Sequence, residues 1–367
     1  MANRTMAAAR ISGVRIAGIA SAVPDQVHLP EEFFERFGKD EVQKVVASTG
    51  VYKRYLAPPG MCTSDLCQAA ANRLISAGKW DRSSIDAIIF LSQSPDYSLP
   101  FTAAIVQRRL GLASECAAFD VNLGCSGYVY GLWLAGSLIA GGGMRRVLLL
   151  MGDTSTHVSE EDKSVALIFG DAGTATLLDK TDEPGDFVFT LGTDGRGEKN
   201  LIIPAGRCRK PSDAATRLRN SDKDGNRRSL EELYMNGAEI FAFTLAEVPK
   251  TVRNVLVASG RTIETIDSIV LHQANRFILE YLGKRMKIPM NKIPLSLGEF
   301  GNTSSASIPL TMTHCLRDAL SQRKMDLLLC GFGVGYSWGA VSCSVGEIIM
   351  PEMVFLALDK IERETEI

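Results

Sequence analysis

The chain has almost no net charge. Its 367 residues carry 40 Lys and Arg against 42 Asp and Glu, which gives a formal net charge of −2 at pH 7. A protein that grips nucleic acid through phosphates needs a positive surface, and this balance does not supply one. We therefore expect no nucleic-acid partner. With 46% hydrophobic residues, the chain is long enough to bury a large core in one to three domains.

Cysteine pairs of the kind that bind zinc or carry a redox disulfide are also lacking. There are eight Cys but no Cys-x-x-Cys, and no His or further Cys completes a zinc pattern around Cys62 and Cys67. Scattered cysteines with mostly apolar neighbours fit a reducing compartment, where disulfides are rare. We predict a cytoplasmic protein without a metal site.

Charged residues are missing from residues 121–144, a stretch long enough to span a bilayer. The stretch also holds Asn122, a Gly-Cys turn and three Gly at 141–143, so about fifteen residues remain for a helix. A helix that is apolar on all sides is what the centre of a large domain requires. No secretory h-region precedes Ile11, where we expect a strand. We predict a buried helix and no membrane partner.

Cys125 lies at the start of that helix. An apolar, β-prone run ends at Asn122, and a Gly-Cys turn leads into the uncharged segment. Unpaired N–H groups and the helix dipole favour a thiolate at such a position, and the small neighbours Gly124 and Ser126 leave room for a substrate. The common alternative for a lone cysteine is a small buried hydrophobe. Two downstream segments favour the nucleophile.

Both segments are junctions of the same kind. The β-branched run 269–271 ends at His272 and precedes a helical pattern, so His272 is predicted at the carboxyl end of a strand. Asn302 lies in a Gly-Asn turn that opens the small-residue segment 303–307, which allows close backbone packing. Each feature alone is more often structural, but all three in one chain are hard to explain as accident.

Together these motifs resemble those of β-ketoacyl-acyl-carrier-protein synthase III, a condensing enzyme of the thiolase superfamily with a Cys-His-Asn triad. The matching stretches are Asn-Leu-Gly-Cys-Ser-Gly at Cys125, His-Gln-Ala-Asn at His272 and Gly-Asn-Thr-Ser-Ser-Ala-Ser-Ile-Pro at Asn302. Segments 331–339 and 169–173 add to the resemblance, which covers roughly residues 11–346.

Strand-like runs alternate with amphipathic helical runs, which predicts an α/β fold with buried strands. We expect strands at 14–20, 87–91, 117–121, 146–151, 166–169, 266–271, 325–330 and 340–345, and helices at 64–77, 102–110 and 277–286. The resemblance implies a thiolase-like fold of five layers, α-β-α-β-α, made of two similar halves.

The chain divides near its middle at a polar break over residues 179–185. We predict an N-terminal half (1–180) that carries the nucleophilic Cys and a C-terminal half (181–350) that carries His and Asn. An extension (351–367) is expected to form a short amphipathic helix.

The chemistry that the resemblance implies has a candidate for each step. Cys125 would hold an acyl group, because a thiolate is both a good nucleophile and a good leaving group. His272 and Asn302 would donate hydrogen bonds to the enolate formed when a malonyl thioester loses carbon dioxide. The backbone N–H groups of Cys125 and Val334 would form the oxyanion hole, although Val334 stands where ketosynthases of this type usually have Gly. The glycine run around Val334 is no dinucleotide fingerprint, because another strand follows it.

We therefore predict an acyltransferase of the 3-oxoacyl-carrier-protein synthase III type. It would perform a decarboxylative Claisen condensation in fatty acid or specialised, polyketide-like biosynthesis. It would need no cofactor, with acyl-CoA or acyl-carrier protein and a malonyl thioester as substrates. Two alternatives stay open: transfer of the acyl group to a non-malonyl acceptor, and a ketosynthase-like subunit of a hetero-complex. Asn302 argues against the first and the complete triad against the second. The resemblance implies a homodimer, and a pair with a related chain remains open.

Departures from the family pattern bear on the substrate. Lys44 and Ser48 replace the Trp and Arg that commonly sandwich the adenine of coenzyme A, and Lys163 replaces a frequent Arg. Leu99 stands in for an aromatic residue that often closes the acyl pocket from the dimer partner, and Phe332 is the other expected pocket residue. We infer a primer longer than acetyl, or one delivered by a carrier protein.

Two basic segments are candidate docking surfaces. Lys284 and Arg285, with Lys287, end the helix after His272, where the family presents basic residues to its acidic carrier. A solubilising helix end is an equal alternative, since cations there also favour the dipole. The turn-rich stretch 207–228 has eight basic and three acidic residues and is expected to be a surface loop, either solvated or partner-docking.

Overall fold

Two β-sheets organise the computed structural model, which describes residues 8–183 and 185–361. The first sheet has the order β17 (Val354–Leu356), β2 (Val14–Pro24), β8 (Ala172–Lys180), β7 (Arg146–Asp153), β5 (Ala87–Leu91), β6 (Ala117–Val121). The second has the order β1 (Ala9–Ser12), β9 (Asp186–Thr193), β16 (Ser337–Gly346), β15 (Lys324–Gly333), β14 (Ser268–Leu271).

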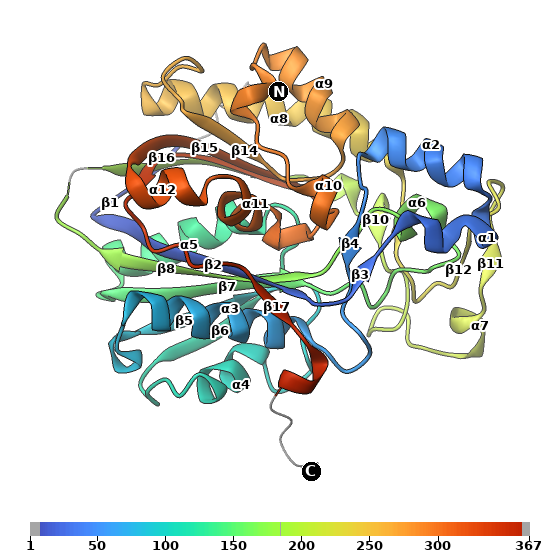
Figure 1. Ribbon diagram of the computed structural model, residues 1–367, viewed down its shortest axis with the longest axis horizontal. Coiled ribbons are helices and arrows are strands. Elements are labelled where there is room, and N and C mark those ends of the chain that lie inside the picture. The colour runs from blue at the N-terminus through green and yellow to red at the C-terminus, as the bar shows by residue number, and fades with distance from the viewer. Residues whose placement is uncertain (1–7, 184, 362–367) are drawn as a thin grey trace.

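Helices separate and cover these sheets (Figure 1). Between them lie α5 (Gly127–Gly141) and α11 (Ser307–Cys315), while α3 (Thr63–Gly78) and α4 (Thr102–Arg109) cover the first sheet outside. The outer face of the second sheet carries α8 (Gly237–Ser259) and α9 (Arg276–Met286). The predicted five-layered α-β-α-β-α arrangement is confirmed.

The uncharged segment is buried because α5 packs between the two sheets. Tyr128, Val129 and Leu132 are at most 1% exposed and join one core cluster with residues of both sheets. Among the residues that the structure describes, no helix is long and apolar enough to cross a membrane.

Two predicted elements are wrong. Residues 354–356 form a strand, β17, rather than a helix, and pair in parallel with β2. The side chains alternate between two faces, as in a strand. Val354 and Leu356 pack on the core cluster that contains α3, whereas Phe355 is exposed and its ring centroid lies 5.5 Å from that of Tyr55. Residues 166–169 form no strand; α6 (Lys163–Ala166) ends there, and Phe169 makes a single β-bridge to Asn302.

Strand pairing links the two predicted halves more closely than their boundaries suggest. The chain passes from the first sheet to the second between β8 and β9, near residue 180. However, β1 from the N-terminal half completes the second sheet, and β17 from the extension completes the first. The division into halves remains a prediction.

Parallel strands bring the candidate residues to one region. β6 and β7 both run parallel to β5, and β14 runs parallel to β15, so residues that follow β5, β6 and β7 emerge together, as do those after β14 and β15. Residues 92–94, 122–125 and 153–155 follow the first group; His272 and Val334 follow the second.

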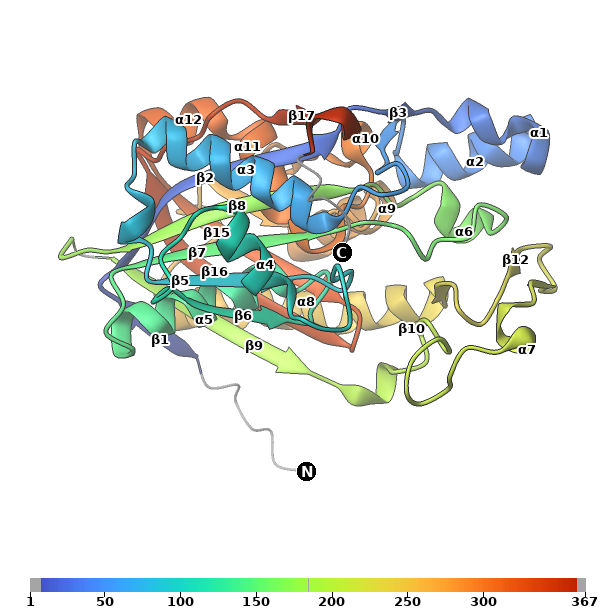
Figure 2. The same ribbon diagram turned by 90° about the horizontal axis from the view of Figure 1, so that it is seen from below.

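The segment between β9 and α8 lies beyond the sheets, at the same end of the molecule as α1, α2 and α6 (Figure 2). Its elements are β10 (Leu201–Ile202), α7 (Ala214–Arg217), β11 (Asn220–Ser221), β12 (Arg227–Arg228) and β13 (Tyr234–Met235). The remaining short elements are β3 (Val27–His28), β4 (Arg54–Tyr55), α1 (Phe34–Phe37), α2 (Lys39–Thr49), α10 (Leu297–Phe300) and α12 (Arg317–Gln322).

Candidate active site

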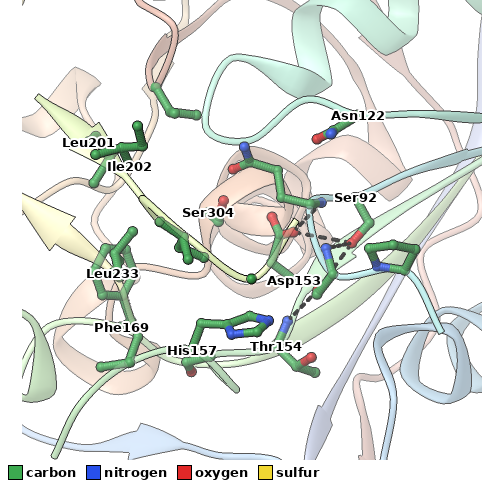
Figure 3. Close-up of a pocket in the computed structure, with 18 of the residues that line it drawn as sticks. Ser92, Asn122, Asp153, Thr154, His157, Phe169, Leu201, Ile202, Leu233 and Ser304 are labelled. Carbon is green, nitrogen blue, oxygen red and sulfur yellow. Dashed lines mark hydrogen bonds between the residues drawn. The ribbon is translucent and has the colours of Figure 1, made fainter. Parts of the chain in front are cut away.

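A cavity of about 830 Å³ lies where the first sheet's parallel strands end. Its lining includes residues 92–95, 122, 125, 153–155, 201–203, 302, 304 and 334. Figure 3 shows apolar side chains on one side (Phe169, Leu201, Ile202 and Leu233) and polar ones on the other (Ser92, Asp153 and Thr154). This two-sided lining can hold an aliphatic group next to polar, reacting atoms.

Cys125 lines the cavity two residues before α5 begins and is only 7% exposed. Burial raises the pKa of its thiol to about 11, helped by the Asp153 charge, while hydrogen bonds from Ser304 and from the backbone of Val334 and Cys125 lower it in part. The helix N-terminus therefore does not produce the low thiol pKa expected from the sequence, because desolvation outweighs it. Both predicted oxyanion-hole N–H groups do face the sulfur.

The glycine turn is shaped by its close approach to Cys125. A Cβ on Gly333 would lie 2.7 Å from the Cys125 Cβ and 3.0 Å from its Sγ, so a side chain there would displace the thiol. The positive φ of the turn, 137°, falls on Gly335. Val334 therefore does not need a positive φ, and its backbone N–H hydrogen-bonds the Cys125 sulfur.

Asn302 is held through its backbone. Its N–H donates to the Ile168 carbonyl at 2.9 Å, and its own carbonyl accepts from the Gly170 N–H at 3.1 Å. The side-chain Oδ1 accepts from the Ser304 N–H at 2.9 Å. That bond fixes the amide orientation, so the side-chain NH₂ is the donor left for a ligand in the cavity that Asn302 lines.

His272 directly follows β14 and is 2% exposed. Its Nδ1 lies 2.7 Å from the Ser307 hydroxyl, and its ring meets Phe332 edge-on with centroids 5.5 Å apart. Burial lowers the imidazole pKa to about 3, although a hydrogen bond with the Ser304 backbone raises it slightly. The ring is therefore neutral at pH 7 and suited to donate a hydrogen bond without carrying charge.

The three predicted triad residues converge on Ser304, which the sequence reasoning missed. The Ser304 Oγ lies 3.9 Å from the Cys125 Sγ, its N–H binds Asn302, and its backbone binds His272. Ser304 has a φ of 49°, in the left-handed region. The run of small residues at 303–307 is the signal in the sequence that points to this turn, although close packing alone also explains it.

Asp153 is a second functional candidate that the sequence reasoning missed. It ends β7, and its Oδ1 accepts from the Gln93 N–H at 2.7 Å and the Ser92 hydroxyl at 3.1 Å. Its Oδ2 accepts from the Ser305 hydroxyl at 3.0 Å and the Ser305 N–H at 3.3 Å. Burial raises the carboxyl pKa, opposed by these bonds and by one from Ser304. The predicted strand, 146–151, stopped two residues short of it.

The predicted pocket residues lie elsewhere. Leu99 is 82% exposed, and Phe332, 2% exposed, packs against the His272 ring. Neither is among the described residues that line the 830 Å³ cavity. Lys284 and Arg285 are exposed at the end of α9, as expected. Within residues 8–183 and 185–361, no cluster of three His, Cys, Asp or Glu is placed to hold a metal ion.

Comparison with known proteins agrees with this geometry. Residues 119–195 match the family model "3-oxoacyl-[acyl-carrier-protein (ACP)] synthase III", and residues 256–345 match its C-terminal counterpart. A putative 3-oxoacyl-[acyl-carrier-protein] synthase 3 from Campylobacter jejuni is 33% identical over 96% of this chain and 99% of its own length. The chain belongs to the 3-oxoacyl-[acyl-carrier-protein] synthase III family.

A solved structure and a second relative found by sequence agree. A 3-oxoacyl-(acyl-carrier protein) synthase from Burkholderia xenovorans has a TM-score of 0.91 and 42% identity, covering 96% of this chain and 99% of its own. The synthase III of Caldanaerobacter subterraneus is 32% identical over 85% of this chain and 94% of its own length. The predicted family and enzyme class are thus confirmed: the chain is an acyltransferase of the condensing type.

Proposed function

We propose that Cys125, His272 and Asn302 catalyse a decarboxylative Claisen condensation. The observation that carries the proposal is the cavity that Cys125, Asn302 and Val334 line together, with Ser304 contacting Cys125, Asn302 and His272. In the first step the Cys125 thiolate attacks an acyl thioester, and the donor leaves as a thiolate that takes a proton from solvent. The N–H groups of Cys125 and Val334 hold the tetrahedral oxyanion.

Decarboxylation follows at the same site. A malonyl thioester loses carbon dioxide, and the negative charge moves onto its thioester oxygen. The neutral His272 ring and the Asn302 NH₂ are the donors for this oxygen; the Ser307 hydroxyl donates to Nδ1, which places the ring proton on Nε2. The enolate oxygen replaces the Ser304 backbone as the partner of His272. The carbanion then attacks the Cys125 thioester and frees Cys125 as a thiolate.

The cavity supports a primer longer than acetyl. Leu201, Ile202 and Leu233, from β10 and the chain before β13, form an apolar wall facing the polar side of the cavity. Delivery by a carrier protein is favoured over coenzyme A because Lys44 and Lys163, at the positions of the family's nucleotide clamp, both bind Glu41, at 2.8 and 3.7 Å. In this proposal the primer carrier and the malonyl carrier dock at Lys284 and Arg285, and the enzyme works as a cytoplasmic homodimer without a cofactor.

Intact-protein mass spectrometry tests the nucleophile. The enzyme is incubated with acyl-CoAs and acyl-carrier proteins of graded length, in a background with the exposed Cys208 and Cys315 replaced by Ala. A gain of one acyl mass that disappears in Cys125→Ala is expected, followed by a 3-oxoacyl product when a malonyl thioester is added. No mass gain with any donor would contradict the proposal. Acylation without a condensation product would favour transfer to a non-malonyl acceptor.

Charge reversal at α9 tests carrier docking. Replacing Lys284 and Arg285 by Glu should raise KM for a carrier-borne substrate about tenfold and leave a CoA-borne one unaffected, with an effect that shrinks at high salt. Lys360→Glu, an exposed lysine outside α9, is the matched control. An equal loss with both kinds of substrate would contradict docking at this helix end.

A further inference from the structure

Two polar side chains near Cys125, Ser304 and Asp153, have no role in the proposed condensation. Ser304 touches the reacting sulfur, with its Oγ 3.9 Å from Cys125 Sγ. A hydrogen bond from the same side chain lowers the pKa of the Asp153 carboxyl, which lines the cavity. Figure 3 places Ser304 and Asp153 side by side. A thiol, a hydroxyl and a carboxylate thus form one chain.

We propose that Ser304 and Asp153 form the path by which the Cys125 thiol loses its proton; the proposal rests on Cys125 being the nucleophile. The S–H proton passes to the Ser304 oxygen while the Ser304 proton passes to Asp153. The products are a thiolate, an unchanged hydroxyl and a neutral carboxylic acid, so one proton moves and no other reactant is needed. When the acylated Cys125 is later freed as a thiolate by condensation, the proton returns along the same path.

The surroundings of Asp153 suit a proton acceptor. Its four bonds from Ser92, Gln93 and Ser305 fix the position of the carboxylate beside Ser304. Protonating it removes the negative charge that opposes the thiolate, so the transfer relieves repulsion rather than creating it. His272, by contrast, is bound to Ser307 and to the Ser304 backbone, and burial keeps its pKa low.

Other titratable groups around the cavity have their own partners or lie apart. Asp120 accepts from the N–H groups of Thr102 and Ala103, and Asp171 accepts from those of Ala57 and Ser155. The remaining ones that line the cavity are Tyr97, His157, Arg207 and Glu231, and His272 contacts the Ser304 backbone. Of these groups, Asp153 is the one joined to the sulfur through a single hydroxyl.

A shared proton has a distinctive pH profile. While the thiol and Asp153 together hold one proton, the thiolate fraction does not change with pH, whereas an isolated thiol gains thiolate tenfold per pH unit below its pKa. We therefore expect the rate of Cys125 alkylation by iodoacetamide, read by peptide mass in the Cys208→Ala, Cys315→Ala background, to be flat over a pH range below the thiol pKa of about 11, where the pair holds one proton. This measurement needs no acyl donor and is independent of condensation.

Variants then separate the path from a structural role. Asp153→Asn and Ser304→Ala should each replace the flat profile by a tenfold rise per pH unit. Ser305→Ala is the matched control: it removes a hydrogen bond to the same carboxylate and should keep the profile flat. A tenfold rise per unit in the unmodified enzyme would overturn the proposal. So would a profile that stays flat in Asp153→Asn but is lost in His272→Asn, which would make His272 the acceptor. If the unmodified enzyme is not acylated at Cys125 by any acyl donor, the proposed function is contradicted instead.

Discussion

At the scale of single residues, the nucleophile is constrained by contact more than by charge. Cys125 lies against the backbone of β15, and only the missing side chain of Gly333 makes room for the sulfur. The thiol's pKa is raised by burial, so thiolate must be formed when needed rather than stored. The structure has the small residues around Cys125 that the sequence predicted. It does not have the standing thiolate that the sequence favoured.

Gly333→Ala tests that contact. A Cβ 2.7 Å from the Cys125 Cβ must push the thiol out of line with its oxyanion donors, and a misplacement of about 1 Å costs about 100-fold in rate. We expect acylation, followed by intact mass, to slow by about that factor in a folded protein. Gly195→Ala, where a Cβ meets nothing within 4 Å, is the control. A wild-type acylation rate in Gly333→Ala would mean that the β15 backbone can move away from Cys125, and it would contradict this prediction.

His272 should also leave a trace in the pH dependence of stability. Its pKa is about 3 when folded and 6.5 in the unfolded chain, so between these values only the unfolded state binds the proton. Stability therefore falls as the pH drops below 6.5, by about 1.4 kcal/mol per unit from this group. His272→Asn removes that contribution, and its unfolding free energy should decline less steeply by this amount from pH 6 to pH 4.5. If urea unfolding gave the same pH dependence of the unfolding free energy for the wild type and for His272→Asn, a buried neutral ring would be contradicted.

At the scale of elements, the segment between β9 and α8 forms one wall of the cavity. The basic stretch 207–228 is less free than its charge suggests, because Arg219 and Arg227 both bind Glu161 and Arg228 binds Asp162 and Asp222. These ion pairs fasten the stretch to the loop before α6. The excess of positive charge seen in the sequence is thus partly neutralised by acidic residues far away in the chain.

Arg228→Met tests this anchor. The guanidinium binds the fully buried Asp162 at 2.8 Å and covers the Tyr234 ring, so its loss leaves Asp162 short of a partner. We expect limited proteolysis within residues 207–232 to speed up about tenfold, equivalent to about 1.4 kcal/mol of local stability, and acylation with long primers to slow. Arg209→Met, an exposed arginine of the same stretch, is the control. Unchanged cleavage in Arg228→Met would place the anchor elsewhere.

At the scale of the whole molecule, an apolar loop stands out on the surface. Tyr97, Leu99 and Phe101 are 60%, 82% and 48% exposed, and the loop that carries them also contributes Ser98 and Phe101 to the cavity lining. A cluster of exposed apolar side chains next to a site marks an interaction surface. This agrees with the proposed homodimer, in which Leu99 would face the partner subunit.

Leu99→Asp should weaken that dimer. A buried apolar anchor typically contributes at least about 2 kcal/mol, so the dissociation constant should rise about 30-fold or more in analytical ultracentrifugation. Leu218→Asp, 62% exposed on the segment between β9 and α8, is the matched control and should leave the mass unchanged. A wild-type monomer at micromolar concentration, or an undisturbed dimer in Leu99→Asp, would contradict the proposal.

The sequence by itself determined the fold class and the three triad candidates. Strands at 87–91 and 117–121 were predicted to the residue, because each is a short, mostly apolar run with clear ends. β5 is buried along its whole length, whereas β6 is partly exposed. Cys125 and His272 were found because each lies just after a strand and before a helix. Asn302 was found because a Gly-Asn turn opens a run of small residues, but this turn follows the short helix α10 and not the strand that the sequence predicted. β17 was mistaken for a helix, since three residues of alternation are too few to separate the two periods.

Tertiary structure alone decided the protonation and surroundings of these residues. Burial is a property of the packed molecule, so the raised pKa of Cys125 and the lowered pKa of His272 could not be read from neighbours in the chain. Ser304 and Asp153 are 151 positions apart and meet because the 3-10 helix η5 (Ser304–Ala306), which Ser304 begins, packs against β7. Short sequence motifs identify the residues that can react. The packing of helices and strands that are far apart in the chain determines the burial and the hydrogen-bond partners of those residues.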